Sequence, residues 1–403
     1  MNLSPLHLSP RLSRASWFFI EFFALFTIFL LPFSKSAAEI GITVCLILWV
    51  FRKFPWDEPF PRARIVNAAY ALFFLLTVLS LAHVSPELRA TAFHGLEKWA
   101  KHLLIFFMAL DYFRDKKRTE RFIGVFLIST ALLCADGFIQ MLTGHDFVKH
   151  NAADIPGRLV RMQASLNSPN DLAAFLLLGL PVVFFLWLEE KKWSLKSTAM
   201  AALLTVMGVA FITTLSRGAL LALLISAVFY ALAKRKRKIL WLLPVLPAIF
   251  LLSPMLRYNF IGSLGTKNIT VLERLELWKT ALRMIQAHPL VGNGVNLFVE
   301  KYASFSGTVT QYKGYAHNCY LQMAAEIGIP GLLVFLVPLL AVLPKAIFGS
   351  SQKTALQAGL LVGIPAFLLQ AALDTNFYAL QAAMLFWWFW GMCCALELGG
   401  TGG

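Results

Sequence analysis

The longest polar stretch of the sequence, Arg257 to Gly331, decides how the chain is organised. Its centre reads Glu273-Arg-Leu-Glu-Leu-Trp-Lys-Thr-Ala-Leu-Arg-Met-Ile-Gln-Ala287. Apolar residues recur there at intervals of three and four, from Leu275 through Trp278, Leu282 and Ile285, which is the period of an amphipathic helix. Such a helix suits the membrane interface. We therefore expect residues 254–317 to form a lid that lies over the outer mouth of a helical bundle.

The composition on either side of this stretch is that of a membrane protein. Of the 403 residues 58% are hydrophobic and only 14% are charged, whereas soluble domains carry roughly 25% charged residues. No low-complexity linker divides the chain, so we expect residues 1–403 to form one integral membrane domain. The formal charge of +15 would suggest a nucleic-acid partner in a soluble protein. Here basic loops on the cytoplasmic side explain it, and we expect no nucleic acid.

A membrane-spanning helix takes about 20 apolar residues, and the sequence contains about twelve candidates. The expected fold class is therefore an all-α polytopic membrane protein with one large periplasmic loop. The break between the seventh and eighth candidates is only Ser216-Arg217-Gly218, which predicts a tight helical hairpin. The twelve predicted spans are 17–34, 38–51, 65–83, 96–113, 122–142, 170–188, 197–215, 218–233, 239–253, 318–343, 354–373 and 378–397.

Lys and Arg set the expected orientation. Short, densely basic connections such as 114–121, 191–196 and 234–238 alternate with less basic ones, which places the basic connections and both termini in the cytoplasm. On the other side the cations are scattered near helix ends. They either bind anions or anchor at lipid headgroups by snorkelling.

Two arginines on the outer side are candidates for chemistry. Arg217 interrupts two apolar helices, and an arginine so close to hydrocarbon is costly. Its guanidinium suits bidentate contact with phosphate, although a topological stop is the alternative. Arg274 should lie in the first turn of the amphipathic helix, where the helix dipole disfavours a cation. Either a bound anion or a Glu partner would compensate for that cost.

His317 stands just before the tenth predicted span. Asn318, Gln322 and Glu326 follow at four-residue spacing, which places them on one helix face. Lipid does not tolerate such a stripe, so it should face the bundle or a wet cavity. His317 could remove a proton from a hydroxyl, or it could simply cap the helix. Gly328-Ile-Pro-Gly331 should then break or kink this helix.

The remaining polar residues indicate no further chemistry. The five cysteines and the other histidines show no metal-ligand spacing, and there is no nucleotide-binding motif, so we expect no metal and no cofactor. Pro169 followed by Asn170-Asp171 predicts a helix start capped by one of these two residues. Three acidic residues inside predicted spans have no partner that the sequence reveals: Glu21, Glu39 and Asp136.

Several motifs in this order resemble the O-antigen ligase and polymerase superfamily. They are Thr-Leu-Ser-Arg217-Gly, Pro289-Leu-Val-Gly-Asn-Gly294, His317-Asn-Cys-Tyr-Leu and Glu326-Ile-Gly-Ile-Pro-Gly331. Asn167-Ser-Pro-Asn170 ahead of a span also looks like that family's pattern. The resemblance is firmest over residues 158–331.

The resemblance implies an inverting glycosyltransferase of the GT-C type in the bacterial inner membrane that needs no metal. The donor would be a glycan linked to undecaprenyl diphosphate. A ligase moves the glycan onto the lipid A core at the periplasmic face, whereas a polymerase joins lipid-linked glycans. By motif position His317, Arg217 and Arg274 match the family's essential residues. Other candidate substrate contacts are Arg158, Arg161, Asn170 and Asn318.

The sequence leaves the exact activity open. Ligase is the preferred prediction and polymerase is the alternative, because no motif identifies the acceptor. A transporter of a lipid-linked substrate is a third possibility. Transporters usually show internal repeats with a site at the membrane midplane, and this sequence has no convincing repeat.

Overall fold

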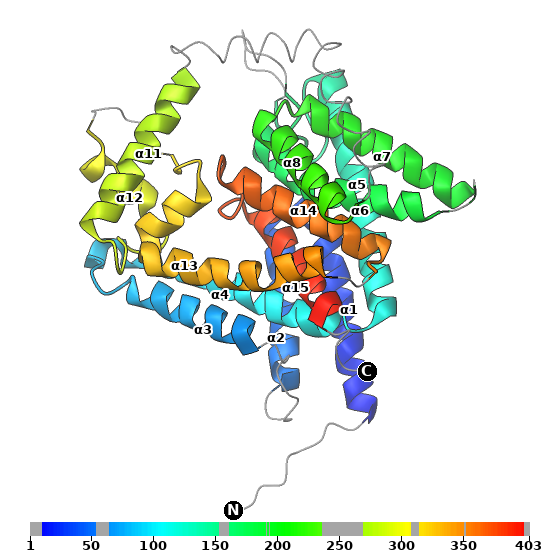
Figure 1. The fold of residues 1–403 in the computed structure, drawn as a ribbon, viewed down its shortest axis with the longest axis horizontal. Helices are drawn as coiled ribbons and strands as arrows, with labels where there is room; N and C mark the ends of the chain where they lie inside the picture. The colour runs from blue at the N-terminus through cyan, green and yellow to red at the C-terminus, as the bar shows by residue number, and fades with distance from the viewer. Residues whose placement is uncertain are drawn as a thin grey trace, which may run out of the picture.

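The computed structural model describes residues 10–53, 64–152, 161–190, 192, 194–235, 269–307, 314–349 and 352–398, and across these ranges it is all-helical (Figure 1). A short 3-10 helix, η1 (Pro86–Leu88), precedes α4. The α-helices are α1 (Pro10–Leu30), α2 (Lys35–Lys53), α3 (Arg64–Leu79), α4 (Arg89–Tyr112), α5 (Lys116–Thr143), α6 (Pro169–Glu189), α7 (Leu195–Thr213), α8 (Arg217–Ala233), α11 (Ile269–Ala287), α12 (Phe298–Phe305), α13 (Cys319–Phe348), α14 (Ala355–Ala371) and α15 (Leu380–Leu398).

The helices agree with the predicted spans. Eleven of the twelve predicted segments coincide with a helix, and the ninth, 239–253, lies outside the described residues. Among the described helices, α5, α6, α7 and α13 are long and apolar enough to cross a membrane, judged by length and composition. The protein is therefore a helical membrane protein, while the number of twelve spans and the GT-C arrangement stay predictions.

The centre of the bundle is α15. Every residue from Gln381 to Ala395 is buried, as expected for a helix that is apolar on all sides. Glycines allow its neighbours to approach closely. A Cβ on Gly391 would lie 2.4 Å from Ala109 of α4, and one on Gly359 of α14 would lie 2.5 Å from the Val182 Cα of α6. Small residues at such contacts are typical of helices that pack within lipid.

The predicted hairpin of the seventh and eighth spans is wrong. The two helices are joined by only three residues, 214–216, but they diverge: α7 packs against α6 and α5, whereas α8 packs mainly against α14. Figure 1 shows α7 extending away from the bundle while α8 lies near α14. The backbone turns sharply at Leu215, where φ is +54°. A short connection between two apolar helices therefore does not mean that they pack against each other.

The outer segment forms a small unit on the start of α13. Leu277, Ala281 and Met284 of α11 are buried together with Phe298 and Tyr302 of α12. Of the apolar stripe predicted from the sequence, Leu275 and Leu282 are exposed. Ile285 packs against the buried cluster and Trp278 is half-buried, so only part of the predicted stripe faces outward. That outward face suits the interfacial position expected for it.

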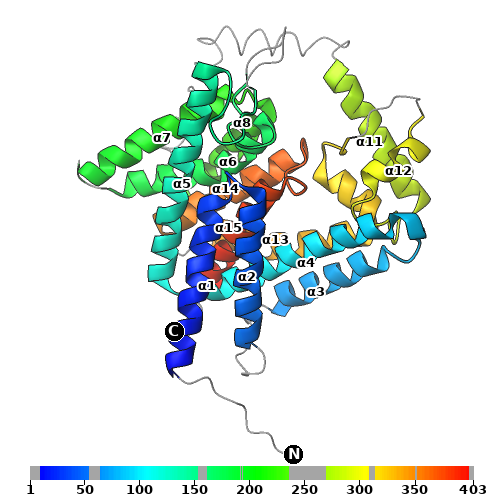
Figure 2. The ribbon, with the colours of Figure 1, turned by 180° about the vertical axis from the view of Figure 1, so that it is seen from behind.

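The connections on the predicted outer side are hydrogen-bonded to one another. The Pro32 carbonyl, between α1 and α2, accepts bonds from Ser165 Oγ (3.0 Å) and Gln381 Nε2 (3.1 Å). Tyr320 Oη donates to the Leu368 carbonyl (2.7 Å). In Figure 2 the helices α1, α2 and α5 stand side by side beneath this end. The ends of distant helices are therefore held together, and the candidate site lies there.

The structure also shows a partner for each of the three acidic residues whose partners the sequence did not reveal. Glu21 of α1 forms an ion pair with Arg121 of α5 (2.5 Å). Glu39 pairs with Lys101 (2.6 Å). Asp136 accepts a hydrogen bond from the Phe147 backbone N–H (2.8 Å).

Candidate functional site

His317 lies in the turn that leads into α13, and its backbone is in the left-handed region with φ +48°. The next residue, Asn318, is the N-cap of α13, and its Oδ1 accepts bonds from the backbone N–H groups of Tyr320 (3.1 Å) and Leu321 (3.0 Å). A positive φ is uncommon outside glycine. Here it lets the chain turn so that Asn318 caps the helix while His317 stays outside it.

A carboxylate that the sequence analysis missed holds the His317 ring. His317 Nδ1 lies 3.1 Å from Asp374 Oδ1, in the connection between α14 and α15. Asp374 is buried, and its Oδ1 also accepts the Thr375 backbone N–H (2.9 Å). An ionised carboxylate only accepts hydrogen bonds, so Nδ1 is the nitrogen that donates to it, and in the neutral ring this leaves the lone pair on Nε2. The one sequence signal for this partner was the polar run Asp374-Thr-Asn376 between two apolar spans.

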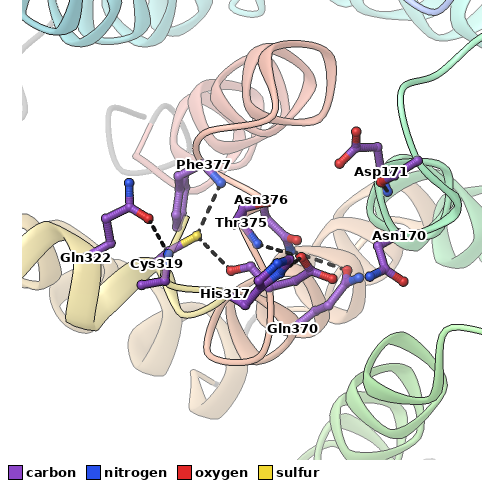
Figure 3. Close-up of polar contacts among 12 residues, drawn as sticks. Asn170, Asp171, His317, Cys319, Gln322, Gln370, Thr375, Asn376 and Phe377 are labelled. Carbon is purple, nitrogen blue, oxygen red and sulfur yellow. Dashed lines mark hydrogen bonds and ion pairs between the residues drawn. The ribbon is translucent and has the colours of Figure 1, made fainter. Parts of the chain in front are cut away.

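Figure 3 shows the surroundings of His317. The ring lies beside Gln370 and the Thr375–Asn376 segment, and Asn170 and Asp171 project from the start of α6 across from it. Asp171 is within electrostatic range of Asp374 and His317. The N-cap of α6 is Ser168, whose side chain accepts the Asp171 backbone N–H. The predicted capping role of Asn170 or Asp171 is therefore wrong.

Three arginines lie within electrostatic range of one another, and one of them is also within range of Asp374. Arg161 donates from Nε to the Thr214 carbonyl (2.7 Å) and from a terminal nitrogen to Asn170 Oδ1 (3.0 Å). It lies within electrostatic range of Asp374, Arg217 and Arg274. Burial, together with the two neighbouring arginines, lowers the pKa of Arg161, while Asp374 raises it. Like charges gathered in this way favour a bound anion.

The two predicted essential arginines come from different elements. Arg217 is the first residue of α8, after the N-cap Ser216, and it is exposed. Arg274 lies in the second turn of α11 rather than the first, because the helix begins at Ile269. Among the described residues Arg274 forms no ion pair, and Glu276 pairs with Lys279 instead. Of the other candidates, Arg158 lies outside the described residues.

The predicted polar stripe faces inward. Gln322 and Glu326 are buried, and Gln322 Nε2 donates to Glu326 Oε1 (3.0 Å). Glu326 also accepts the Asn296 backbone N–H (3.0 Å) and Tyr378 Oη (3.2 Å). This carboxylate thus joins the lid, α13 and the connection that carries Asp374.

Two glycine motifs that are far apart in the sequence, one in the lid and one in α13, pack against each other. Gly292 has φ +74°, and a Cβ on it would lie 2.3 Å from the Glu326 carbonyl oxygen. Gly328 has φ +84°, and a Cβ there would lie 2.3 Å from the Leu290 carbonyl oxygen. The Ile329 N–H donates to the Pro289 carbonyl (2.8 Å). This reciprocal contact, the glycine clasp, fixes α11 against α13. The predicted kink at Gly328 is confirmed, because its backbone is non-helical.

The arrangement can bind an anion and accept a proton at the same place. Three guanidinium groups from separate elements lie within electrostatic range of one another, and one of them, Arg161, is within range of the carboxylate that orients the His317 ring. Within the ranges that the structure describes, no group of three or more His, Cys, Asp or Glu side chains could hold a metal ion.

Comparison with known proteins agrees with the motif resemblance. Residues 200–336 match a family model described as O-antigen ligase. The matched segment contains Arg217, Arg274, His317 and both halves of the glycine clasp. A search of curated proteins finds no match to the chain. Residues 200–336 of this chain are therefore similar to the O-antigen ligase family, in agreement with the motif resemblance.

Proposed function

We propose that this protein is an O-antigen ligase of the bacterial inner membrane. It would transfer a glycan from undecaprenyl diphosphate to the lipid A core at the periplasmic face. The observation that carries this proposal is the contact between His317 Nδ1 and Asp374 Oδ1 (3.1 Å) beside the cluster of Arg161, Arg217 and Arg274. The family match supports the class of substrate.

In this mechanism His317 is the general base. Asp374 holds the Nδ1–H, so Nε2 can take the proton of the acceptor hydroxyl. The hydroxyl oxygen attacks the anomeric carbon of the donor as the bond from that carbon to the diphosphate oxygen breaks. Attack from the face opposite the leaving group inverts the configuration.

The arginines act on the leaving group. Negative charge grows on the diphosphate as the glycosidic bond breaks, and preorganised cations near that oxygen stabilise the transition state. Guanidinium groups bind phosphate oxygens in a bidentate manner. Because Arg161 is fixed by Thr214 and Asn170, it would position the diphosphate, with Arg217 and Arg274 completing the clamp without a metal ion.

The decisive experiment is in vitro transfer with purified protein in detergent. Defined undecaprenyl-diphosphate glycan and lipid A core are supplied, and the products are weighed by mass spectrometry. Wild type should modify the lipid A core, and His317→Ala should abolish this with expression unchanged. His94→Ala, at an exposed histidine of α4, is the control and should behave as wild type. Transfer retained in His317→Ala would refute the base assignment.

The same assay separates the alternatives. Longer lipid-linked glycan with unmodified lipid A core would indicate a polymerase. Turnover of donor in detergent, where there is no membrane to cross, would exclude a transporter as the sole activity. A protein that consumes no donor under any of these conditions would contradict the enzyme proposal as a whole.

A further inference from the structure

A groove of about 530 Å³ lies next to the site, where the connection between α1 and α2 meets the loops before α6. Two cations, Lys35 and Lys149, and three neutral polar residues, Ser34, Ser36 and Asn167, contribute to its lining. Among the residues that the structure describes, no acidic side chain lines it. The volume is in the range of small-ligand sites, roughly 300–1,000 Å³.

The two lysines are held close to one another in partly buried positions. Lys149 Nζ donates to the Ser165 carbonyl, which fixes the ammonium at the groove. Burial lowers the pKa of Lys149, and so does the charge of Lys35, while Asp146 and Asp136 raise it. The oxygens of these two acids already accept backbone N–H groups of residues 147, 149 and 151. The two carboxylates thus use their oxygens on the backbone and make no direct ion pair with the groove lysines within the part of the chain that the structure describes.

Lys35 is the cation best placed for a ligand. It is the first residue of α2 and is half-buried. Within the described ranges its ammonium makes no hydrogen bond or ion pair. Asp171 of α6 is within electrostatic range of both Lys35 and His317, and Asn167 of the groove belongs to the same turn as Asn170, the partner of Arg161. The groove therefore borders the site next to the turn that holds Asn170 and Asp171, with the proposed base His317 in electrostatic range of the same Asp171.

We propose that this groove is a second phosphate subsite, which binds a phosphate group carried on the acceptor glycolipid. This inference rests on the proposed ligase function. The three arginines match the donor diphosphate, and the groove has its own cations, so the two anions are held at separate places. An ammonium binds phosphate as a compact point charge, and the serine hydroxyls and the Asn167 amide supply neutral donors.

The test compares two acceptors in full-length protein reconstituted in nanodiscs: lipid A core with its phosphates and the same lipid after enzymatic dephosphorylation. Lys35→Gln should raise KM for the phosphorylated acceptor about tenfold, the usual order for losing one charged hydrogen bond, and leave kcat nearly unchanged. KM for the dephosphorylated acceptor should not change. Lys35→Arg should return KM for the phosphorylated acceptor most of the way to the wild-type value. Lys98→Gln, at an exposed lysine of α4, should leave KM for both acceptors unchanged.

The proposal would be overturned if Lys35→Gln left KM for the phosphorylated acceptor unchanged. It would also be overturned if the substitution raised KM equally for both acceptors. An effect that follows the phosphatidylglycerol content of the nanodisc, and not the acceptor phosphate, would assign the groove to a lipid headgroup and refute the acceptor assignment. If wild type transfers to neither acceptor, the ligase proposal fails. In that case direct binding of the two lipid A core forms tests the phosphate subsite on its own. The subsite proposal requires that Lys35→Gln weaken binding of the phosphorylated form alone.

Discussion

Asp374 is the residue on which the chemistry of His317 depends most directly. Replacing the carboxylate by an amide in Asp374→Asn keeps an acceptor for the Thr375 N–H but removes the charge that stabilises a protonated His317. A partner that orients a catalytic or metal-bound histidine typically contributes 10–100-fold. We expect kcat for transfer to fall by about that factor with little change in KM for the donor, measured from initial rates.

A merely structural role for Asp374 predicts something different. The pH profile of kcat distinguishes the two, because loss of the carboxylate should move the limb that reports the base. Asp374→Glu should recover part of the rate. An Asp374→Asn protein with a normal pH profile and reduced thermal stability would show that the residue only supports the fold.

A substitution of Arg217 tests whether the arginines bind phosphate through the planar geometry of the guanidinium group or only through its charge. Arg217→Lys keeps the cation but loses the planar fork. We expect at least about a tenfold loss in kcat/KM for the donor, corresponding to roughly 1.5 kcal/mol for a charged hydrogen bond. The control is Arg283→Lys at an exposed arginine of α11 that donates to the Phe305 carbonyl. Equal kinetics in Arg217→Lys and wild type would show that charge alone suffices.

At the scale of elements, the glycine clasp decides where α11 lies. Gly292→Ala and Gly328→Ala would each place a methyl group 2.3 Å from a backbone oxygen and would hold alanine at positive φ. The left-handed backbone alone costs roughly 1–2 kcal/mol, and the clash adds to it. We expect a clearly lower Tm in detergent for both variants, together with loss of transfer.

Gly124→Ala is the matched control for the clasp. A methyl group on this glycine of α5 would meet no atom within 4 Å, and the residue lies inside a helix, where alanine is favoured by roughly 0.5–1 kcal/mol. Its Tm should be unchanged or higher. A similar Tm for Gly292→Ala and Gly124→Ala would contradict the backbone contact between the two motifs.

For the whole molecule, the orientation in the membrane is open to a direct test. All five cysteines are buried, so thiol labelling of the native protein should be weak. Lys192→Cys, at an exposed position between α6 and α7, should react only after the cytoplasmic side is opened. Glu300→Cys, at an exposed position of α12, should react with an impermeant maleimide from the periplasm. The reverse pattern would invert the proposed topology and place the site on the cytoplasmic face.

The sequence by itself determined where the described helices lie, and it singled out most residues of the candidate site. Apolar runs of about 20 residues can satisfy their backbone within lipid only as helices, so the segments followed from composition and length. His317, Arg217 and Arg274 stood out because polar groups at the edge of apolar spans are costly. The amphipathic period and the Gly-Pro signals located α11 and the kink at Gly328, although Leu275 and Leu282 of the stripe predicted for α11 face outward.

Only the tertiary structure decided which of these parts meet. Lipid is as apolar as the helix surfaces, so hydrophobicity does not select a helix's partner. For that reason the sequence did not reveal that α8 lies against α14 and not along α7. Asp374 is 57 residues from His317, and no local period connects them. The arginine cluster and the lysine groove likewise combine connections from separate parts of the chain, because helix packing brings the ends of distant helices to one place.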